Sequence, residues 1–374
     1  MVKMMESILA KLVSFQCITD NRDANNVALD YIDRFVSDRG MRTRQIEHNG
    51  IRSLVALSRP HHKKPAVMLG GHIDVVPGAE GLFTLQQDNE KYYGRGVLDM
   101  KGSIAVFLSV IDELKGKLDQ FDLGLMVTTD EEIGGFNGTP IVLEKGYVPK
   151  VCILPDGGAD WQIQTSAKGV FQLKITTSGQ AAHGSQPWKG DNANLKLIRV
   201  IHEIYGLFPK NGPDDNTINI GKISGGEAVN QVADSAEAHI DIRVISEKDR
   251  DELRAAIERI CLEHGAQLSV VTDGISTNFN LQNPYIKRFA EIVTEVTNVK
   301  ITGSHAHGSS DARFFAERNI PCISLYPPGG GHHSSDEWVR IESLHQLKKI
   351  VTQYILETAT ESSKEELQEP DLVA

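Results

Sequence analysis

The sequence lacks a long hydrophobic run. Nowhere in its 374 residues does it approach the roughly 18 consecutive apolar residues that a membrane-spanning helix needs. The first 17 residues do not resemble a secretory signal peptide, because Glu6 and Lys11 interrupt their apolar positions. With 40% hydrophobic and 24% charged residues, the composition predicts a soluble, globular protein without a membrane partner.

Cysteines and basic residues are scarce as well. The four cysteines, Cys17, Cys152, Cys261 and Cys322, are scattered and contain no Cys-x-x-Cys motif. We therefore expect a reduced, cytoplasmic protein whose cysteines are not metal ligands. The formal net charge of −11 argues against nucleic acid, which needs a basic footprint. Part of this acidity lies in residues 361–374, which we interpret as a disordered, solvated tail without a function.

Hydrophobic periodicity predicts alternating helices and strands. Helices are expected at 3–16, 23–39, 102–114, 139–146, 283–296, 310–318 and 342–359, and strands at 52–57, 65–69, 123–128, 151–154 and 321–325. Between these elements the order changes to strand 170–177, helix 191–207, strands 217–223 and 235–244, helix 248–264 and strand 267–272. This βαββαβ order is the ferredoxin-like arrangement. We expect an α/β fold with a discontinuous domain, 1–165 and 276–374, and an inserted domain, 166–275.

Polar side chains that can bind a metal follow several of the predicted strands. These are His72 and Asp74, Glu131 and Glu132, Asp156, and His332 and His333, and Asp99, which precedes a predicted helix, completes the set. Acidic residues at such positions often only cap helices or turns. However, several unpaired carboxylates in one place would repel one another, and cations relieve that repulsion. Imidazole and carboxylate ligands without a thiolate suit zinc, and also cobalt or manganese.

Together these motifs resemble those of the co-catalytic zinc aminoacylase and carboxypeptidase family. That family includes acetylornithine deacetylase, succinyl-diaminopimelate desuccinylase and glutamate-releasing carboxypeptidases. The resemblance extends from about residue 5 to residue 359. It implies a phosphorylase/hydrolase-like α/β catalytic domain and an inserted ferredoxin-like domain that serves as a lid and in dimerisation.

The resemblance also implies a role for each polar residue of the set. Two Zn²⁺ ions per subunit are expected, with Co²⁺ or Mn²⁺ as possible substitutes. One ion is held by His72 and Asp156 and the other by Glu132 and His333, with Asp99 as the bridge, Glu131 as the general base and Asp74 as the partner of His72. An extended backbone would point the two adjacent glutamates in different directions, so one can bind metal while the other faces the bound water.

Two further expectations concern the bridge and the last ligand. The family pattern of a histidine, three residues and a glutamate fits His333 and Glu337, which makes His332 a neighbour. The resemblance, together with the need to aim a bridging carboxylate while a helix starts, also predicts a cis peptide bond between Asp99 and Met100.

The inserted domain has signals of its own. The segment 182–187 resembles the family's lid segment, in which His183 would stabilise the oxyanion; a surface-loop histidine is the alternative. Asn230 and Arg243 resemble a clamp for a substrate carboxylate, since arginine offers a bidentate fork for that group. One departure is Ala233, which stands where the family often has proline.

The segment 308–313 resembles a further substrate-side loop. Ser310 would then bind substrate, although Ser310 and Asp311 could equally be only the N-cap of the next helix. His305 and His307 lie close by and have no role that the resemblance assigns.

The expected function is hydrolysis of an amide bond in a small N-acyl amino acid or peptide, in the manner of a deacetylase or desuccinylase. Within this class the alternative is a dipeptidase or carboxypeptidase, and outside it a metal-binding protein that has lost catalysis. We also expect a homodimer through the inserted domain, with His183 reaching the partner's active site. The acyl group, the amino acid, the metal used in the cell and the pathway do not follow from the sequence.

Overall fold

The computed structural model describes residues 2–360, so the predicted acidic tail lies outside the described residues. The chain divides into two compact units. Unit 1 contains the described residues up to Thr165, Asn278–His305 and those from Ser310, and unit 2 contains Ser166–Thr277 and Ala306–Ser309. None of the helices within residues 2–360 has the length and apolar character needed to cross a membrane.

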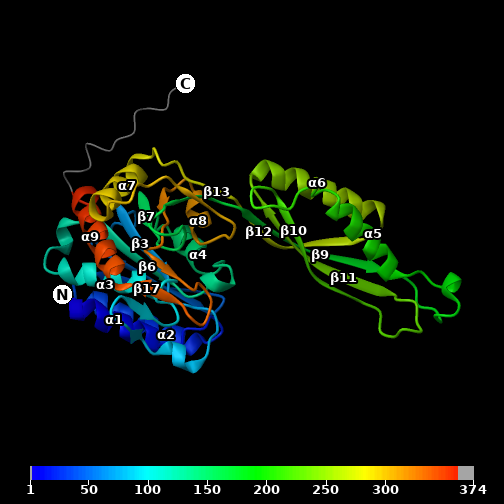
Figure 1. The fold of residues 1–374 in the computed structure, drawn as a ribbon, viewed down its shortest axis with the longest axis horizontal. Coiled ribbons are helices and arrows are strands. Elements are labelled where there is room, and N and C mark those ends of the chain that lie inside the picture. The colour runs from blue at the N-terminus through cyan, green and yellow to red at the C-terminus, as the bar shows by residue number, and fades with distance from the viewer. Residues whose placement is uncertain (1, 361–374) are drawn as a thin grey trace, which may run out of the picture. The chain divides into compact units, whose positions relative to one another are not determined.

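Unit 1 is built around a six-stranded sheet (Figure 1). Its order is β1 (Arg42–His48), β2 (Ile51–Leu57), β6 (Leu123–Thr128), β3 (Val67–His72), β7 (Val151–Ile153) and β15 (Cys322–Ile323). The last four strands are parallel to one another, whereas β1 and β2 are antiparallel to their neighbours. The carboxyl ends of the parallel strands therefore meet at one edge of the sheet.

Helices cover this sheet because their apolar faces need burial. They are α1 (Val2–Ser14), α2 (Arg22–Ser37), α3 (Lys101–Glu113), α4 (Thr139–Glu144), α7 (Pro284–Thr297), α8 (Ala312–Ala316) and α9 (Ile341–Thr358). Helix α3 packs against α1, α9 and the sheet, and its residues from Lys101 to Ile111 are all buried. A helix that is apolar nearly all round is typical of such a central position.

Smaller elements complete the described chain. One sheet has the order β16 (Gly329–Gly330), β17 (Trp338–Arg340), β5 (Lys91–Tyr93) and β4 (Gln86–Gln87). Another has the order β13 (Thr277–Asn278), β8 (Gln164–Ala167) and β14 (Ser304–Ala306). Short 3₁₀ helices are η1 (Glu80–Phe83), η2 (Leu118–Gln120), η3 (Glu131–Ile133) and η4 (Pro187–Lys189).

Unit 2 has its own sheet and its own core. The elements are β9 (Gly169–Ser178), α5 (Ala193–Tyr205), β10 (Thr217–Gly225), β11 (Ser235–Val244), α6 (Glu247–Glu263) and β12 (Gln267–Gly274). All neighbouring strands in the sheet, whose order is β10–β11–β9–β12, are antiparallel. Helices α5 and α6 lie on one face of it (Figure 1). Inward-facing residues such as Leu173 and Ile240 form a core with Leu197 of α5 and Ile257 of α6.

Most predicted elements are confirmed to within a few residues, but the edge strand β1 was not predicted. The strand alternates weakly because it is exposed along nearly its whole length. Its hairpin with β2 turns at Asn49 and Gly50, which both have positive φ (49° and 75°). An Asn-Gly pair is the usual signal for such a turn, so this strand was detectable from its turn and not from its periodicity.

Candidate active site

Three of the predicted metal ligands meet at the carboxyl edge of the main sheet. His72 is the last residue of β3, and Asp156 comes shortly after β7. Asp99, in the loop before α3, reaches the same place: its Oδ1 lies 3.2 Å from Nε2 of His72. One ligand atom from each of these three buried residues lies within 4.8 Å of the others.

A second group surrounds the other oxygen of Asp99. Its Oδ2 lies 2.7 Å from Nε2 of His332 and 3.3 Å from Nε2 of His333. The same nitrogen of His333 is 3.1 Å from Oε2 of Glu132. Asp99 is only 4% exposed, so its carboxylate lies buried between two separate sets of donors.

The two histidines were expected at the end of a strand, and they follow β16 in the connection to β17 of the smaller sheet. His333 was predicted as the ligand and His332 as its neighbour; in this structure His332 lies closer to Asp99 than His333 does. The two rings stack with their centroids 4.0 Å apart. Within residues 2–360, only His333 of the two also contacts Glu132.

The donors fit a divalent cation. Oδ1 of Asp156 accepts a hydrogen bond from the Tyr326 hydroxyl at 2.8 Å. Its Oδ2 is buried and has no hydrogen-bond partner among residues 2–360, although an uncompensated buried oxygen is costly. Burial, followed by the charge of Asp99, raises the pKa of Asp156 to about 6. A cation beside Oδ2 would satisfy this oxygen, and mixed imidazole and carboxylate donors suit zinc, cobalt or manganese.

The charges within this cluster are strongly coupled. Burial tends to raise the pKa of Asp99, but hydrogen bonds from His332, His333 and His72 outweigh it and hold that pKa well below its usual value. Hydrogen bonds to Asp99 and Glu132 raise the pKa of His333 to about 10. Without metal the imidazoles therefore hold protons that balance the carboxylates. Because ligands must be deprotonated, a bound metal would release these protons.

Asp74 was expected only to orient His72, but it also holds the segment that carries the two adjacent glutamates. Nδ1 of His72 is 3.0 Å from the backbone oxygen of Asp74 and 3.5 Å from its carboxylate. The carboxylate instead accepts hydrogen bonds from the backbone N–H groups of Glu131 and Glu132, at 3.3 and 3.2 Å. The hydroxyl of Thr19, which the sequence analysis did not single out, donates to it at 2.9 Å. Asp74 thus positions the adjacent glutamates.

Glu131 and Glu132 point in different directions, as expected, but the cause is not the extended backbone that the sequence analysis assumed. They belong to the 3₁₀ helix η3 and not to an extended segment, so the helical turn separates their side chains. Oε2 of Glu131 is 4.0 Å from Nε2 of His72, whereas Oε2 of Glu132 meets His333. Burial, followed by the charge of Asp156, raises the pKa of Glu131 well above its usual value.

The peptide bond between Asp99 and Met100 is cis, as predicted.

The loop that carries Asp99 is held in place by a buried ion pair that the sequence analysis did not predict. Glu337 accepts a hydrogen bond from Nη1 of Arg95 at 2.9 Å, and both side chains are almost fully buried. The spacing from His333 pointed to Glu337, but no sequence signal indicated Arg95 as its partner.

The candidate residues of unit 2 fall into two places. His183 and Gln231 form an isolated β-bridge, and the N–H of Gly184 donates to the backbone oxygen of Asn230 at 2.7 Å, so the exposed residues His183 and Asn230 lie close together. Arg243 lies at the far end of β11, where it pairs with Val170, and its guanidinium contacts Asp241 at 2.9 and 3.0 Å. One chain therefore does not place Asn230 beside Arg243, and their role as a clamp for a substrate carboxylate stays a prediction.

The remaining candidates lie near the start of α8. The Ser310 hydroxyl accepts the N–H of Ala312 at 3.4 Å, which is a cap-like contact. Asp311 stands at the N-cap position of α8, but its side chain makes no capping hydrogen bond; its Oδ2 instead accepts a hydrogen bond from the Thr139 hydroxyl at 2.6 Å. His305, in β14, and His307 are exposed. All four cysteines are buried free thiols and belong to neither group of candidate ligands in the described chain.

Imidazoles and carboxylates gathered at the carboxyl ends of parallel strands are typical of a metal-dependent enzyme. The chain belongs to peptidase family M20/M25/M40, whose model matches residues 68–357. It is therefore a hydrolase that acts on amide bonds.

Known proteins of similar sequence and structure agree with this family. Succinyl-diaminopimelate desuccinylase of Rickettsia bellii is 26% identical over 385 residues, which cover 95% of this chain and 97% of that protein. A tripeptidase from Staphylococcus aureus has a similar fold, with a TM-score of 0.77 at 20% identity and coverage of 95% and 98%. A metallo-carboxypeptidase of family M20 from Sulfolobus solfataricus gives a TM-score of 0.76 at 16% identity, with coverage of 94% and 98%.

Proposed function

We propose that the protein cleaves the amide bond of a small N-acyl amino acid or peptide with two divalent cations, expected to be zinc. The observation that carries this proposal is the buried carboxylate of Asp99, whose two oxygens face different donors. His72 and Asp156 would hold one cation, Glu132 and His333 the other, and Asp99 both. Cobalt or manganese could substitute, because the donors are the same imidazoles and carboxylates.

Glu131 is proposed as the general base. When bound, such a metal pair polarises the scissile carbonyl and acidifies a water molecule. Glu131 lies beside the donor cluster at 4.0 Å from His72 and is buried enough for its pKa to be raised. A carboxylate of this kind can take a proton from the attacking water and return it to the leaving amine. Asp74 keeps Glu131 in place through the backbone N–H of that residue.

The layout of unit 2 supports a role for His183 in a neighbouring subunit. Ser178 pairs with Ser235 at the end of the sheet nearest His183, whereas Val170 pairs with Arg243 at the other end. Eight strand residues at about 3.4 Å each separate these ends by roughly 27 Å. One unit 2 therefore cannot bring both side chains to one small substrate. Arg243 from one subunit and His183 from the other could meet there, with Asn230 accompanying His183.

A homodimer through unit 2 is the arrangement we propose for this. Leu195, Ile198 and Tyr205 lie on one face of α5 and are 54%, 59% and 49% exposed. Strand β10 is an edge of the four-stranded sheet and carries Ile223, which is 59% exposed. An apolar helix face beside an unpaired edge strand is suited to pairing with a second copy.

The substrate class is proposed from the relatives. The Rickettsia protein is a desuccinylase, whereas the solved structures include a tripeptidase and a carboxypeptidase. We favour a deacylase of the deacetylase or desuccinylase kind, with a dipeptidase or carboxypeptidase as the alternative. Arg243 would bind a substrate carboxylate in either case, and Ser310 is a second candidate contact. A metal-binding protein without catalysis is disfavoured. Glu131 is not one of the proposed ligands, yet it lies beside them, where a general base would be needed.

The test is an activity panel with the zinc-loaded protein. N-acetyl, N-succinyl and N-formyl amino acids would be assayed beside dipeptides and tripeptides by following the released amine. We expect one of these classes to be cleaved, activity to disappear with a chelator, and zinc or cobalt to restore it. A protein that holds zinc and cleaves none of these amides would contradict the proposal.

A further inference from the structure

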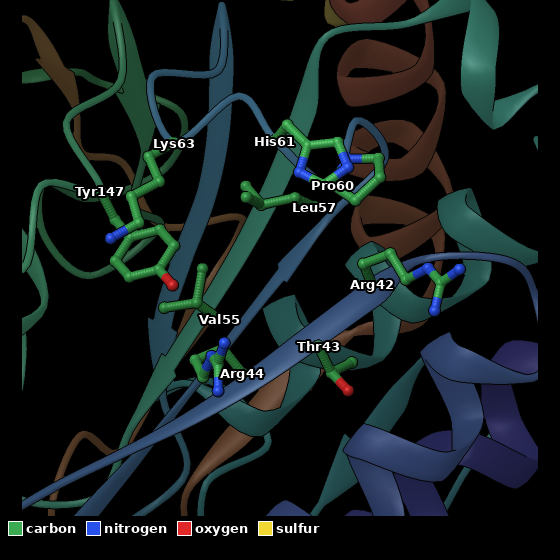
Figure 2. Close-up of a pocket in the computed structure, with 9 residues that line it drawn as sticks. All are labelled: Arg42, Thr43, Arg44, Val55, Leu57, Pro60, His61, Lys63 and Tyr147. Atoms are coloured by element: carbon green, nitrogen blue, oxygen red, sulfur yellow. The ribbon is translucent and has the colours of Figure 1, made fainter.

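A second candidate binding site lies in unit 1 against the hairpin of β1 and β2. It is a cavity of about 430 Å³, within the size range of small-molecule sites (Figure 2). Four of its nine lining residues are basic, and none of the nine is acidic; the basic ones are Arg42, Arg44, His61 and Lys63. In a chain whose formal net charge is −11, the three cationic side chains among them, Arg42, Arg44 and Lys63, favour an anionic ligand.

The strand register explains how the cavity combines charge with an apolar floor. Arg42 and Arg44 are two residues apart on β1, so they project from the same face of the sheet. They pair with Leu57 and Val55 of β2, which are 5% and 1% exposed. Figure 2 shows these two apolar side chains between Arg42 on one side and Tyr147 on the other.

The two arginines of the cavity are not used by the fold. Among the described residues, Arg42 and Arg44 have no ion pair or side-chain hydrogen bond, whereas the nearby Arg52 pairs with Asp30 at 2.8 Å. Lys63 is held in position, because its amine lies 4.9 Å from the centroid of the Tyr147 ring and donates to a backbone oxygen. The cavity therefore offers two unpaired guanidinium groups and one fixed ammonium group.

The cavity is distinct from the candidate active site. Leu57, on its floor, pairs with Gly124 near the amino end of β6, and Gly124 pairs with Met68 near the amino end of β3. His72 and Thr128 pair at the other end of these strands. Four residues at about 3.3 Å each put roughly 13 Å between the two ends. A ligand in this cavity would not occupy the metal-binding cluster.

We propose that the cavity binds a small organic phosphate. Its oxyanion would contact Arg42 and Arg44, and its organic part would pack on Val55, Leu57 and Tyr147. A phosphate monoester is close to a dianion at neutral pH and matches several cations better than one carboxylate does. Charges on an edge strand can also serve only to prevent sheet extension. That role would require neither the cavity nor its apolar floor.

The experiment is a calorimetric titration of the full, zinc-loaded chain with phenyl phosphate. We expect one saturable site, weaker binding of inorganic phosphate and of phenylacetate, and no binding of benzyl alcohol. The double variant Arg42→Gln/Arg44→Gln should lose at least about tenfold in affinity, since each charge-assisted hydrogen bond contributes this much or more. The matched control is Lys64→Gln/Lys117→Gln, which removes two exposed charges outside the cavity and should leave the affinity unchanged.

A repeat of the titration after chelation distinguishes this site from the metal cluster. Phenyl phosphate should bind equally well without metal. The proposal is overturned if binding disappears with the metal, if the double variant binds as tightly as the unaltered chain, or if no binding occurs at all. Equal affinity for benzyl alcohol would exclude charge recognition, and tighter binding of phenylacetate would exclude the phosphate class.

Discussion

The carboxylate of Glu337 accepts a hydrogen bond from the backbone N–H of Asp99, with a nitrogen–oxygen distance of 3.2 Å. It also accepts from the N–H groups of Leu98 and Gly96, at 3.0 and 2.9 Å. Its ion-pair partner Arg95 donates to the backbone oxygen of His333 at 3.3 Å. This buried pair therefore fixes two loops that carry proposed ligands, although neither residue is itself expected to bind metal.

The first prediction concerns this support. Glu337→Gln should weaken zinc binding by about 10–100-fold, as loss of partners behind metal ligands commonly does. An amide nitrogen in place of one oxygen would face backbone N–H groups and displace the loop of Asp99. Zinc retained after dialysis against a competing chelator is the measurement, and Glu342→Gln, on the exposed side of α9, is the control.

This substitution also leaves Arg95 buried without its partner, which can cost about 3–5 kcal/mol of stability. Circular dichroism would show whether the fold persists. If it does not, Arg95→Lys provides a milder change, because lysine keeps the charge but not the fork that reaches both Glu337 and His333. Unaltered zinc affinity in folded variants of both kinds would disprove the supporting role.

The second prediction separates the adjacent histidines. His333→Ala should remove about one of the two expected zinc ions per chain, because it deletes the contacts to both Asp99 and Glu132. His332→Ala should leave two ions bound, since the ring nitrogen Nε2 of His332 meets only the carboxylate of Asp99 and no second proposed ligand within the described chain. Native mass spectrometry of both variants measures the stoichiometry. The opposite pattern would make His332 the ligand.

Both histidines lie close to Asp99, but the sequence analysis indicated this contact only for His333, and the reason is physical. The carboxyl ends of β3, β6 and β7 could be expected to meet, because parallel strands in such folds end at the same edge. The approach of His332 depends on a hairpin of another sheet and on the positive φ of His333, 61°. No spacing rule determines that conformation. The sequence could therefore predict that this pair of histidines lies near the metal site, but not which of the two lies closer to Asp99.

Contacts between residues that are far apart in the sequence could not be predicted either. Most helices and buried strands follow from local periodicity. The contact of Arg95 with Glu337 and that of Asp156 with Tyr326 join segments that only the fold brings together. The shape of η3 was also missed, because three residues are too few for a periodic signal.

The third prediction concerns pH. Burial raises the pKa of Asp311 to about 7 in the folded protein, against about 3.9 in an unfolded chain. A raised folded-state pKa means that the protonated form stabilises the fold. This contribution is complete below the unfolded pKa and is lost as the pH rises through about 7.

Asp311→Asn cannot ionise at this position and should lack that dependence. Urea unfolding of both proteins, in the presence of a chelator, measures the free energy of unfolding from about pH 5 to pH 8. The unaltered protein should lose stability relative to the variant by at most about 1.4 kcal/mol per pH unit. Identical pH profiles would contradict the shifted pKa.

The fourth prediction tests whether His183 acts in the partner subunit. His183→Ala and Glu131→Gln should each be nearly inactive as homodimers, because one lacks the oxyanion contact and the other the base. A heterodimer of the two has one active site with both groups intact and should recover activity. Subunit exchange would be verified by differential tags. No recovery despite proven exchange would mean that His183 acts in its own chain or has no catalytic role.

The most direct test of the account compares the adjacent glutamates for zinc content and turnover in the same samples. Glu131→Gln should keep the zinc stoichiometry of the unaltered protein and lose several orders of magnitude in kcat, because it removes proton transfer but no ligand. Glu132→Gln should instead lose zinc, because Glu132 is the carboxylate that meets His333. Near-normal kcat in a fully zinc-loaded Glu131→Gln protein would contradict the proposed mechanism.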